Sequence, residues 1–205
     1  MPTPDVQGRA PAKNSAIAKG ATNVAGGGTP GATATLTVHG VLMEICGIGV
    51  LMRGSSGIGK GDLALQLISR GHRLIADDAP LLSRASQGLS GSCPPLLRNL
   101  LEVRGLGVLN IAKQFGEEAT ASSTLLQLIV TLDTLAATSE RDIAGPLYDT
   151  CRLLDVEVPE VHLALWPGRP VALLVETLVK NFKLQQQGYF AHADLSERQR
   201  RVMAQ

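Results

Sequence analysis

The sequence has no excess of charge of either sign. Its 19 Lys and Arg residues are balanced by 18 Asp and Glu residues, which leaves a formal net charge of +1 over 205 residues. Proteins that bind nucleic acid through its phosphates usually carry a clear basic excess. The composition therefore gives no reason to expect a nucleic-acid partner, although a local basic patch stays compatible with it.

Cysteine is scarce as well. The three cysteines, Cys46, Cys93 and Cys151, are odd in number, irregularly spaced and without a CxxC pair. A disulfide framework or a zinc cluster needs more cysteines in a closer pattern. We therefore expect a protein of a reducing compartment and predict a cytoplasmic location.

No apolar run is long enough to cross a membrane as a helix. The most apolar stretch, LTVHGVLMEICGIGVLM (36–52), is interrupted by His39, Glu44 and three glycines, whereas a membrane helix needs about 20 predominantly apolar residues. The stretch predicts two strands and a turn, and we expect no membrane partner. The N-terminus has no charged segment followed by an apolar run, which argues against a secretory signal.

The chain is long enough for one well-buried domain and short for two. Residues 1–34 contain no Leu and no aromatic residue, so we expect a disordered low-complexity tail. A targeting peptide is the alternative, because three basic residues there outnumber Asp5, but the Gly-Gly-Gly run and the missing amphipathic stripe weigh against it. Residues 35–192 are expected to form the folded domain, and residues 193–205 a basic C-terminal tail.

A strand, a glycine-rich loop, a helix and another strand follow one another after the tail. Residues 35–45 are strand-like, and VLMRG (50–54) forms a second strand that runs into the loop. DLALQLISRG (62–71) predicts a helix that ends at Gly71, and HRLIADD (72–78) predicts a short buried strand. This order is typical of an α/β fold.

The second half continues the same pattern. Short antiparallel strands are expected within 79–100, and further strands at LLQLIVTLD (125–133) and VHLALWPG (161–168). Residues 170–188 open with Pro170, place apolar side chains on one face and close at Gly188, which predicts a helix.

The loop GSSGIGKGD (54–62) has the GxxxxGK pattern of a phosphate-binding loop. Its glycines allow successive backbone N–H groups to point into one concavity, and the following helix directs its positive end to the same place. An ordinary Gly-rich turn would explain the glycines, but not a lysine between the loop and an apolar helix. The predicted nucleotide-binding residues are Gly54, Ser55, Ser56, Gly57, Ile58, Gly59, Lys60 and Gly61.

Gly61 departs from this pattern. A Ser or Thr at this position normally places a hydroxyl on the metal that bridges the nucleotide phosphates. Glycine has no hydroxyl to offer. Either a water, the hydroxyl of Ser55 or Ser56, or carboxylates elsewhere in the chain bind the metal instead, or metal binding has been lost. Asp62 is best explained by favourable charge at a helix start.

Asp77 and Asp78 follow the short buried strand, where the next strand of such a unit ends beside the phosphate loop. One carboxylate there can hold magnesium while its neighbour accepts a proton from an attacking hydroxyl. Adjacent strand residues face opposite ways, so the two are expected to do different jobs. A plain acidic turn is the alternative.

Three segments, residues 39–78, LLEVRGLGVLNIAKQFG (100–116) and WPGRPVALLVETLVKNFKLQQQGY (166–189), together resemble the catalytic domain of bacterial HPr kinase/phosphorylase. The likeness spans nearly all of 35–192 in order. Its most specific parts are RGH-RL-ADD and LEVRGLGVLNI, because generic phosphate-loop proteins have neither. The resemblance implies a P-loop-containing α/β fold of the HPr kinase or PEP carboxykinase-like kind, with a mixed central sheet.

The resemblance also implies an activity. Enzymes of this kind use ATP and Mg²⁺ to phosphorylate a regulatory serine of the phosphocarrier protein HPr, and they remove that phosphate by attack of inorganic phosphate, giving pyrophosphate. They thereby regulate the phosphotransferase system and carbohydrate metabolism. The chain resembles a shortened, catalytic-domain-only form that can lack the hexamer of the longer form, so a homo-oligomer stays open.

Residue by residue, the resemblance makes Asp78 the general base that deprotonates the serine and the acid of the reverse step. The active-site histidine falls on His39 and the phosphate lysine on Lys60. Magnesium ligands are expected at Asp77 and Glu102.

Two arginines complete the expected set. Arg169 of the PGR turn falls in a second catalytic segment, and Arg141 is a weaker match because the SERDIAG spacing differs by about two residues. Arg104, beside Glu102 in a Gly-rich turn, can neutralise phosphate oxygens. Each has a plain alternative: Glu102 and Arg104 could be a surface pair, and His39 a structural histidine.

Competing functions remain at this point. The first is an active HPr serine kinase/phosphorylase. The second is a catalytically weak nucleotide sensor that binds an HPr-like partner without modifying it, which the glycine at position 61 keeps open. A small-molecule kinase is the third, but it does not explain the RGLGVLN segment.

Overall fold

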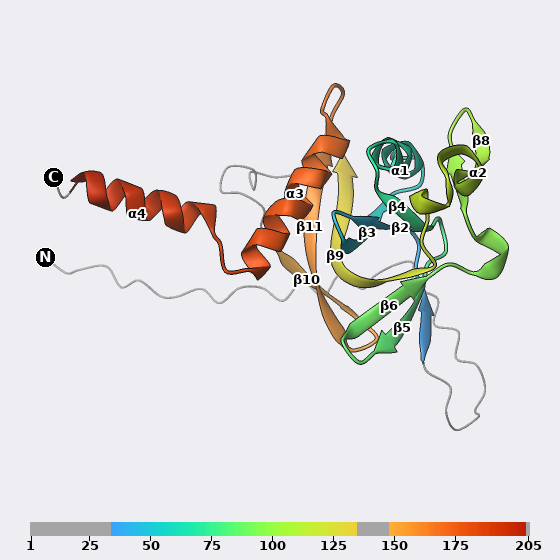
Figure 1. The fold of residues 1–205 in the computed structure, drawn as a ribbon, viewed down its shortest axis with the longest axis horizontal. Helices are drawn as coiled ribbons and strands as arrows, with labels where there is room; N and C mark the ends of the chain where they lie inside the picture. The colour runs from blue at the N-terminus through green and yellow to red at the C-terminus, as the bar shows by residue number, and fades with distance from the viewer. Residues whose placement is uncertain (1–33, 135–147, 204–205) are drawn as a thin grey trace, which may run out of the picture.

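The computed structural model describes residues 34–134 and 148–203. The expected N-terminal tail, apart from Ala34, and Arg141 lie outside these ranges. Among the described residues, nine strands form one mixed sheet and two more form a separate hairpin (Figure 1). The predicted α/β fold with a mixed central sheet is confirmed.

The strands follow one another in runs of two or three, with helices between the runs and two helices at the C-terminal end. The main sheet contains β1 (Thr35–Thr37), β2 (Val41–Ile45), β3 (Ile48–Gly54), β4 (Arg73–Ala76), β5 (Leu81–Ala85), β6 (Gly88–Ser92), β9 (Ser123–Thr134), β10 (Asp149–Leu153) and β11 (Val156–Leu165). The hairpin consists of β7 (Leu100–Val103) and β8 (Gly107–Asn110). The helices are α1 (Lys60–Ser69), α2 (Ile111–Phe115), α3 (Val171–Gln186) and α4 (Ala191–Met203), with single 3₁₀ turns at Pro95–Leu97 and Glu117–Ala119.

The sheet runs in the order β1-β5-β6-β9-β3-β2-β4, and β11 and β10 branch from β9. The long strand β9 makes the branch possible, because its first residues pair with β6 and its last with β11. It pairs with β3 in parallel along most of its length. The strand expected at 125–133 is therefore found at the centre of this sheet as β9, and the one expected at 161–168 as β11 on the branch, which ends at Leu165.

The buried residues alternate between the two faces of the central strands, as the two-residue repeat of a strand requires. On one face Val41, Met43 and Met52 pack with α1 and α3. On the other face Leu42 and Leu51 pack with residues of β1, β5, β6 and the β10–β11 pair. The very apolar stretch 36–52 is thus explained by burial on both sides.

The predicted strand over 35–45 is wrong in one respect, because the structure divides it into β1 and β2. Gly40 has φ 151°, and a Cβ there would lie 2.5 Å from the Met52 carbonyl oxygen of β3. The close approach of β3 breaks the strand at this glycine. His39 consequently lies in a turn at the sheet edge and not within a strand.

Both predicted helices are confirmed. Helix α1 starts directly after Gly59, which adopts the left-handed conformation, and is followed by Gly71 at φ 88°. Helix α3 starts after Pro170, and Gly188 follows it at φ 88°. Left-handed glycines are common helix terminators, which is why the sequence signal was clear.

The topology brings two segments to one edge of the sheet. Strands β3 and β4 flank β2, and each is antiparallel to it, so β3 and β4 run the same way. Their carboxyl ends therefore meet, and the glycine loop after β3 lies near Asp77 and Asp78 after β4. This is the arrangement in which α/β sheets bind ligands.

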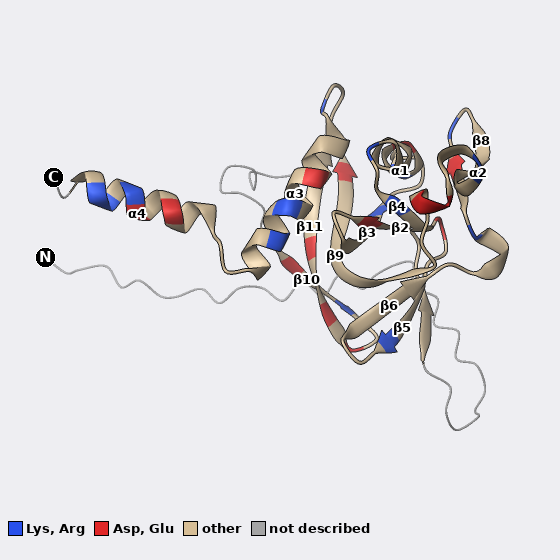
Figure 2. Ribbon diagram, in the orientation of Figure 1, with Lys and Arg blue, Asp and Glu red and all other residues tan. Residues whose placement is uncertain are grey.

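The C-terminal helix α4 extends away from the sheet (Figure 1) and has no buried residue. Acidic and basic residues are interspersed along this helix (Figure 2), and they include the ion pairs Asp194–Arg198 and Glu197–Arg201. Within the described ranges, no helix combines the length and the apolar character that a membrane span requires.

Candidate active site

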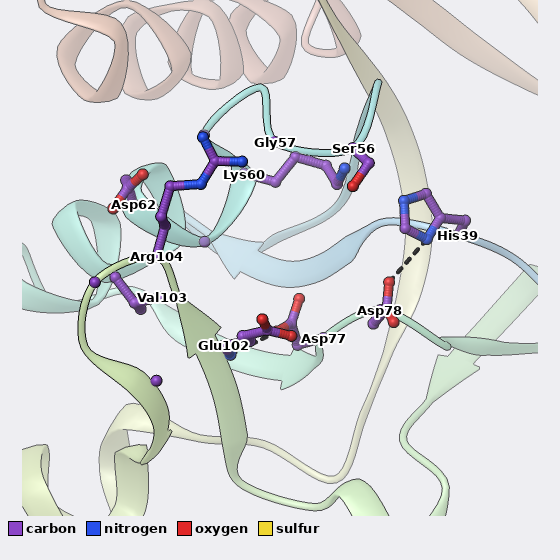
Figure 3. A pocket seen from close by; sticks show the side chains of 14 residues that line it. His39, Ser56, Gly57, Lys60, Asp62, Asp77, Asp78, Glu102, Val103 and Arg104 are labelled. Carbon is purple, nitrogen blue, oxygen red and sulfur yellow. Dashed lines mark hydrogen bonds and ion pairs between the residues drawn. The ribbon is translucent and has the colours of Figure 1, made fainter.

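A cavity of about 510 Å³ opens where the loop after β3, the residues after β4 and the β7–β8 hairpin meet (Figure 3). It is lined mainly by charged and glycine residues, with Lys60 and Arg104 on one side and Asp77, Asp78 and Glu102 facing them, while Asp62 lies beside Arg104 (Figure 3). The lining residues are His39, Ser56, Gly57, Gly59, Lys60, Gly61, Asp62, Asp77, Asp78, Glu102, Val103, Arg104, Gly105 and Gly107.

The glycine loop forms the cationic side. Lys60 folds back over the loop, and its Nζ donates to the carbonyl oxygens of Gly54 at 3.0 Å and Ser55 at 3.2 Å. Gly57 and Gly59 both have positive φ, which turns the chain sharply before α1. The loop therefore presents a cation and the positive end of a helix to the same cavity.

Three of the predicted loop residues, Gly54, Ser55 and Ile58, are not among the residues that line the cavity. The Gly54 carbonyl holds Lys60, and a Cβ at Gly54 would lie 2.8 Å from the Leu132 carbonyl oxygen, so only glycine fits there. Ile58 packs against the core cluster beneath the loop. These residues shape the loop without lining the cavity.

Arg104 reaches the loop from the turn of the β7–β8 hairpin. A Cβ at Gly57 would lie 2.5 Å from one of its guanidinium nitrogens, so the glycine leaves room for the arginine. In Figure 3 the side chains of Arg104 and Lys60 lie on the same side of the cavity. Two cations so placed are suited to phosphate oxygens.

Asp78 and His39 form a pair on the opposite side. The Oδ1 of Asp78 lies 2.8 Å from Nδ1 of His39, and the two side chains are 71% and 49% exposed. Asp78 has φ 65°, a left-handed conformation that non-glycine residues adopt uncommonly and that aspartate tolerates better than most. The pair is accessible from outside, so a large acceptor molecule can reach the carboxylate.

Asp77 points towards the hairpin, although β4 ends at Ala76 and both aspartates lie beyond the strand whose alternation was expected to separate them. Its Oδ2 accepts a hydrogen bond of 2.8 Å from the backbone N–H of Glu102. Burial raises the pKa of Asp77, opposed by the hydrogen bond from Glu102, while the nearby charges of Asp78 and Glu102 raise it further. A carboxylate in such surroundings favours a cation beside it.

The carboxylates of Asp77 and Glu102 fit a magnesium ion that is shared with a nucleotide. Among residues 34–134 and 148–203 no group of three or more His, Cys, Asp or Glu could hold a metal alone. Magnesium, however, is commonly bound by one or two carboxylates together with substrate phosphates and waters. Asp77 and Glu102 supply these carboxylates next to the cationic loop.

The structure gathers most of the predicted site, but Arg169 lies elsewhere. Its guanidinium lies 3.8 Å from the centre of the Trp166 ring and donates to the Ala164 carbonyl. It lines a smaller hollow of about 120 Å³ on the other side of the loop, with Ile58, Gly59 and Asp62. Arg141 lies outside the described residues.

A buried charged cluster at the end of α1 opposite the glycine loop was not predicted. Glu176 of α3 is 5% exposed, and its carboxylate receives two hydrogen bonds from Arg70, at 2.8 and 2.6 Å, and one contact from His72 at 2.8 Å. The hydrogen bonds from Arg70 are the main cause that lowers the pKa of Glu176 to about 2, with burial opposing them. The cluster joins α3 to the end of α1.

His72 is held from both sides. The Cys46 backbone N–H donates to its Nδ1 at 3.5 Å, so Nε2 carries the proton that faces Glu176. These contacts give His72 a structural role. Glu176 itself was not recognised because a glutamate within an amphipathic helix normally faces water.

Comparisons with known proteins all point to one family. The family model for the HPr Serine kinase C-terminal domain matches residues 32–199. Proteins named HPr kinase/phosphorylase from Brevibacillus brevis and Leptothrix cholodnii are 40% and 47% identical to the chain, each over 80% of it. The chain spans about half the length of these relatives, 53% and 51%.

The fold is also similar to a solved structure. The Hpr(Ser) kinase/phosphatase from Coxiella burnetii superimposes with a TM-score of 0.72 at 34% sequence identity. The match covers 78% of this chain and 97% of that one.

Proposed function

The chain belongs to the HPr serine kinase C-terminal domain family, and on that premise we propose that it transfers the γ-phosphoryl group of ATP to a serine of an HPr-like phosphocarrier protein. In the reverse direction inorganic phosphate attacks the phosphoserine, which gives serine and pyrophosphate. The observation that carries the proposal is one cavity with the cations Lys60 and Arg104 on one side and the exposed Asp78–His39 pair on the other.

Asp78 is the proposed general base. Its exposed carboxylate can accept the proton of a serine hydroxyl as the oxygen attacks the phosphorus, which makes the hydroxyl a better nucleophile. In the reverse reaction Asp78 returns that proton to the serine oxygen as the P–O bond breaks. His39, at 2.8 Å, fixes the orientation of the carboxylate.

The loop side binds the phosphates. Backbone N–H groups of the loop, Lys60 and Arg104 stabilise the negative charge of the transferred group and of the leaving phosphate. Magnesium, when bound, would be held by Asp77 and Glu102 and would neutralise charge on the nucleotide oxygens. The nucleotide-binding residues are those of the loop, from Gly54 to Gly61.

The open position of Asp78 favours a protein acceptor. A small-molecule acceptor would be expected in an enclosed pocket, whereas the side chain of Asp78 is 71% exposed. An HPr-like protein is therefore the proposed acceptor. The proposed location is the cytoplasm, and the proposed role is regulation of the phosphotransferase system and carbohydrate metabolism. Inorganic phosphate and pyrophosphate are the small partners of the reverse direction.

The test is a phosphoserine assay. The protein is incubated with ATP, Mg²⁺ and HPr from the same organism, and phosphoserine is measured by mass spectrometry. The proposal predicts modification of one serine that depends on both ATP and Mg²⁺. Binding of ATP without any phosphoserine would contradict it and would favour a nucleotide-binding sensor.

A further inference from the structure

Gly61 is the second residue of α1, and its backbone does not require glycine. It is absent from the positive-φ positions, unlike Gly57 and Gly59. A helical conformation accepts any ordinary residue, and glycine weakens a helix by about 1 kcal/mol relative to alanine. A different constraint must therefore explain the glycine.

That constraint is the backbone of β7. A Cβ on Gly61 would lie 2.2 Å from the carbonyl oxygen of Glu102 and 3.3 Å from its carbonyl carbon. These atoms belong to the main chain and not to the flexible end of a side chain, so they cannot move away without a shift of the β7 backbone. The Glu102 carbonyl thus fills the space that the Cβ of a serine or threonine at position 61 would need.

Strand β7 is held in this position from several sides. The Glu102 N–H donates to Asp77, and Glu102 is in register with Val108 of β8. Its neighbours Leu101 and Val103 are 0% and 2% exposed and belong to the core that α1 also joins. Moving the Glu102 carbonyl away from α1 would disturb all of these contacts.

We propose that Gly61 is a positioning residue of the active site, which lets Glu102 lie against the first turn of α1 so that the Glu102–Asp77 pair faces the phosphate loop. This inference rests on the proposed function, since it concerns the same magnesium site. In this chain the carboxylate oxygens beside the loop come from Glu102 of β7 and from Asp77 after β4, and no hydroxyl at position 61 is needed. Returning a serine to position 61 therefore impairs the site.

Two substitutions separate the Cβ from the hydroxyl. Gly61→Ala adds only the Cβ, and Gly61→Ser adds the Cβ and the hydroxyl. The readout is the Mg²⁺ concentration that gives half-maximal binding of ATP, measured by calorimetry, together with ATP binding in EDTA. Ser69→Ala, at an exposed position of the same helix, is the matched control.

The expected result is the same for both variants. Each raises the half-saturating Mg²⁺ concentration by about tenfold or more, a larger loss than that of ATP binding in EDTA, while Ser69→Ala keeps the wild-type values. A Gly61→Ser protein with wild-type or tighter Mg²⁺ dependence would overturn the inference. So would an equal loss of ATP binding with and without Mg²⁺, because the role of position 61 would then lie in the loop.

A second measurement covers the case in which neither variant folds. A crystal structure of the wild-type protein with Mg²⁺ and a non-hydrolysable ATP analogue should keep the Glu102 carbonyl against Gly61, with carboxylate oxygens on the metal. A loop serine hydroxyl on the metal, or a β7 that has moved away from α1, would overturn the inference. These binding readouts need no acceptor protein, so they separate this inference from a failure of the phosphoserine assay.

Discussion

The contact between His39 and Asp78 joins two residues 39 positions apart and gives the active site its acceptor side. Each residue has an ordinary explanation alone, as a structural histidine and an acidic turn. Their 2.8 Å separation and the positive φ of Asp78 together favour a functional pair. Backbone strain at a residue with an exposed side chain has no evident packing benefit.

We expect His39→Ala to lower kcat by about tenfold while the KM for ATP changes little, because the substitution frees the Asp78 carboxylate without touching the phosphate loop. Steady-state kinetics with the HPr-like acceptor measure both constants. His192→Ala, at an exposed position of α4, is the control. A rise in the KM for ATP with unchanged kcat would place His39 on the nucleotide side.

The β7–β8 hairpin is the element that completes the cavity. It supplies Glu102 against Asp77 and Arg104 against Gly57, and its other side is buried. A two-stranded hairpin has little stability of its own. Its packing on α1 therefore fixes the distance between Glu102, a proposed magnesium ligand, and the phosphate loop.

We predict that Arg104→Ala raises the KM for ATP by about tenfold, since a guanidinium that faces the phosphate loop contributes a charge-assisted contact. The unfolding midpoint should stay near the wild-type value because Arg104 is exposed. Arg200→Ala on α4 is the matched control for loss of an arginine. An unchanged KM for ATP in Arg104→Ala would remove Arg104 from the nucleotide site.

The α1–α3 junction depends on Glu176. Because the pKa of Glu176 is lowered to about 2 from 4.5 in the folded protein, its contribution is fully present above pH 4.5 and is lost as the pH falls through 2. We expect Glu176→Gln to lower the free energy of unfolding by about 2–3 kcal/mol at pH 7.

Urea unfolding of wild type and Glu176→Gln, followed from pH 7 downwards, measures this contribution. The difference between the two proteins should stay constant to pH 4.5 and shrink below it. Glu197→Gln on the exposed helix α4 is the control for acid effects common to both. A difference that persists undiminished near pH 2 would show that the carboxylate charge is not what joins the helices.

At the scale of the whole molecule, the sequence predicted those parts of the fold whose signals lie within a few neighbouring residues. The loop between β3 and α1, the ends of α1 and α3, and the carboxylates after β4 follow from glycines, proline and periodicity within a few residues. The branch at β9 did not follow, because one strand that pairs with three others leaves no local signal. The break at Gly40 depends on the Met52 carbonyl, which comes close only after β2 and β3 have paired.

The same distinction holds within the candidate site. Lys60, Asp77 and Asp78 could be named from motifs, His39 and Glu102 only from the family resemblance, and the fold brings all five together. The Glu102 carbonyl that fills the space beside Gly61 and the Arg70–Glu176 pair join residues 41 and 106 positions apart. Contacts at such separations depend on the packing of β7 and α3 on α1, which spacing in one sequence does not encode.

The central claim is that one carboxylate moves the proton in both directions of serine phosphoryl transfer. The most direct measurement follows phosphoserine formation from ATP and pyrophosphate formation from the phosphoserine protein and inorganic phosphate, with wild type, Asp78→Asn and Asp155→Asn. Asp155, on the exposed β10–β11 turn, also has a positive φ, so it controls for the backbone. The account predicts that Asp78→Asn lowers both rates by about 10²–10⁴-fold and Asp155→Asn neither; survival of either direction in Asp78→Asn would contradict it.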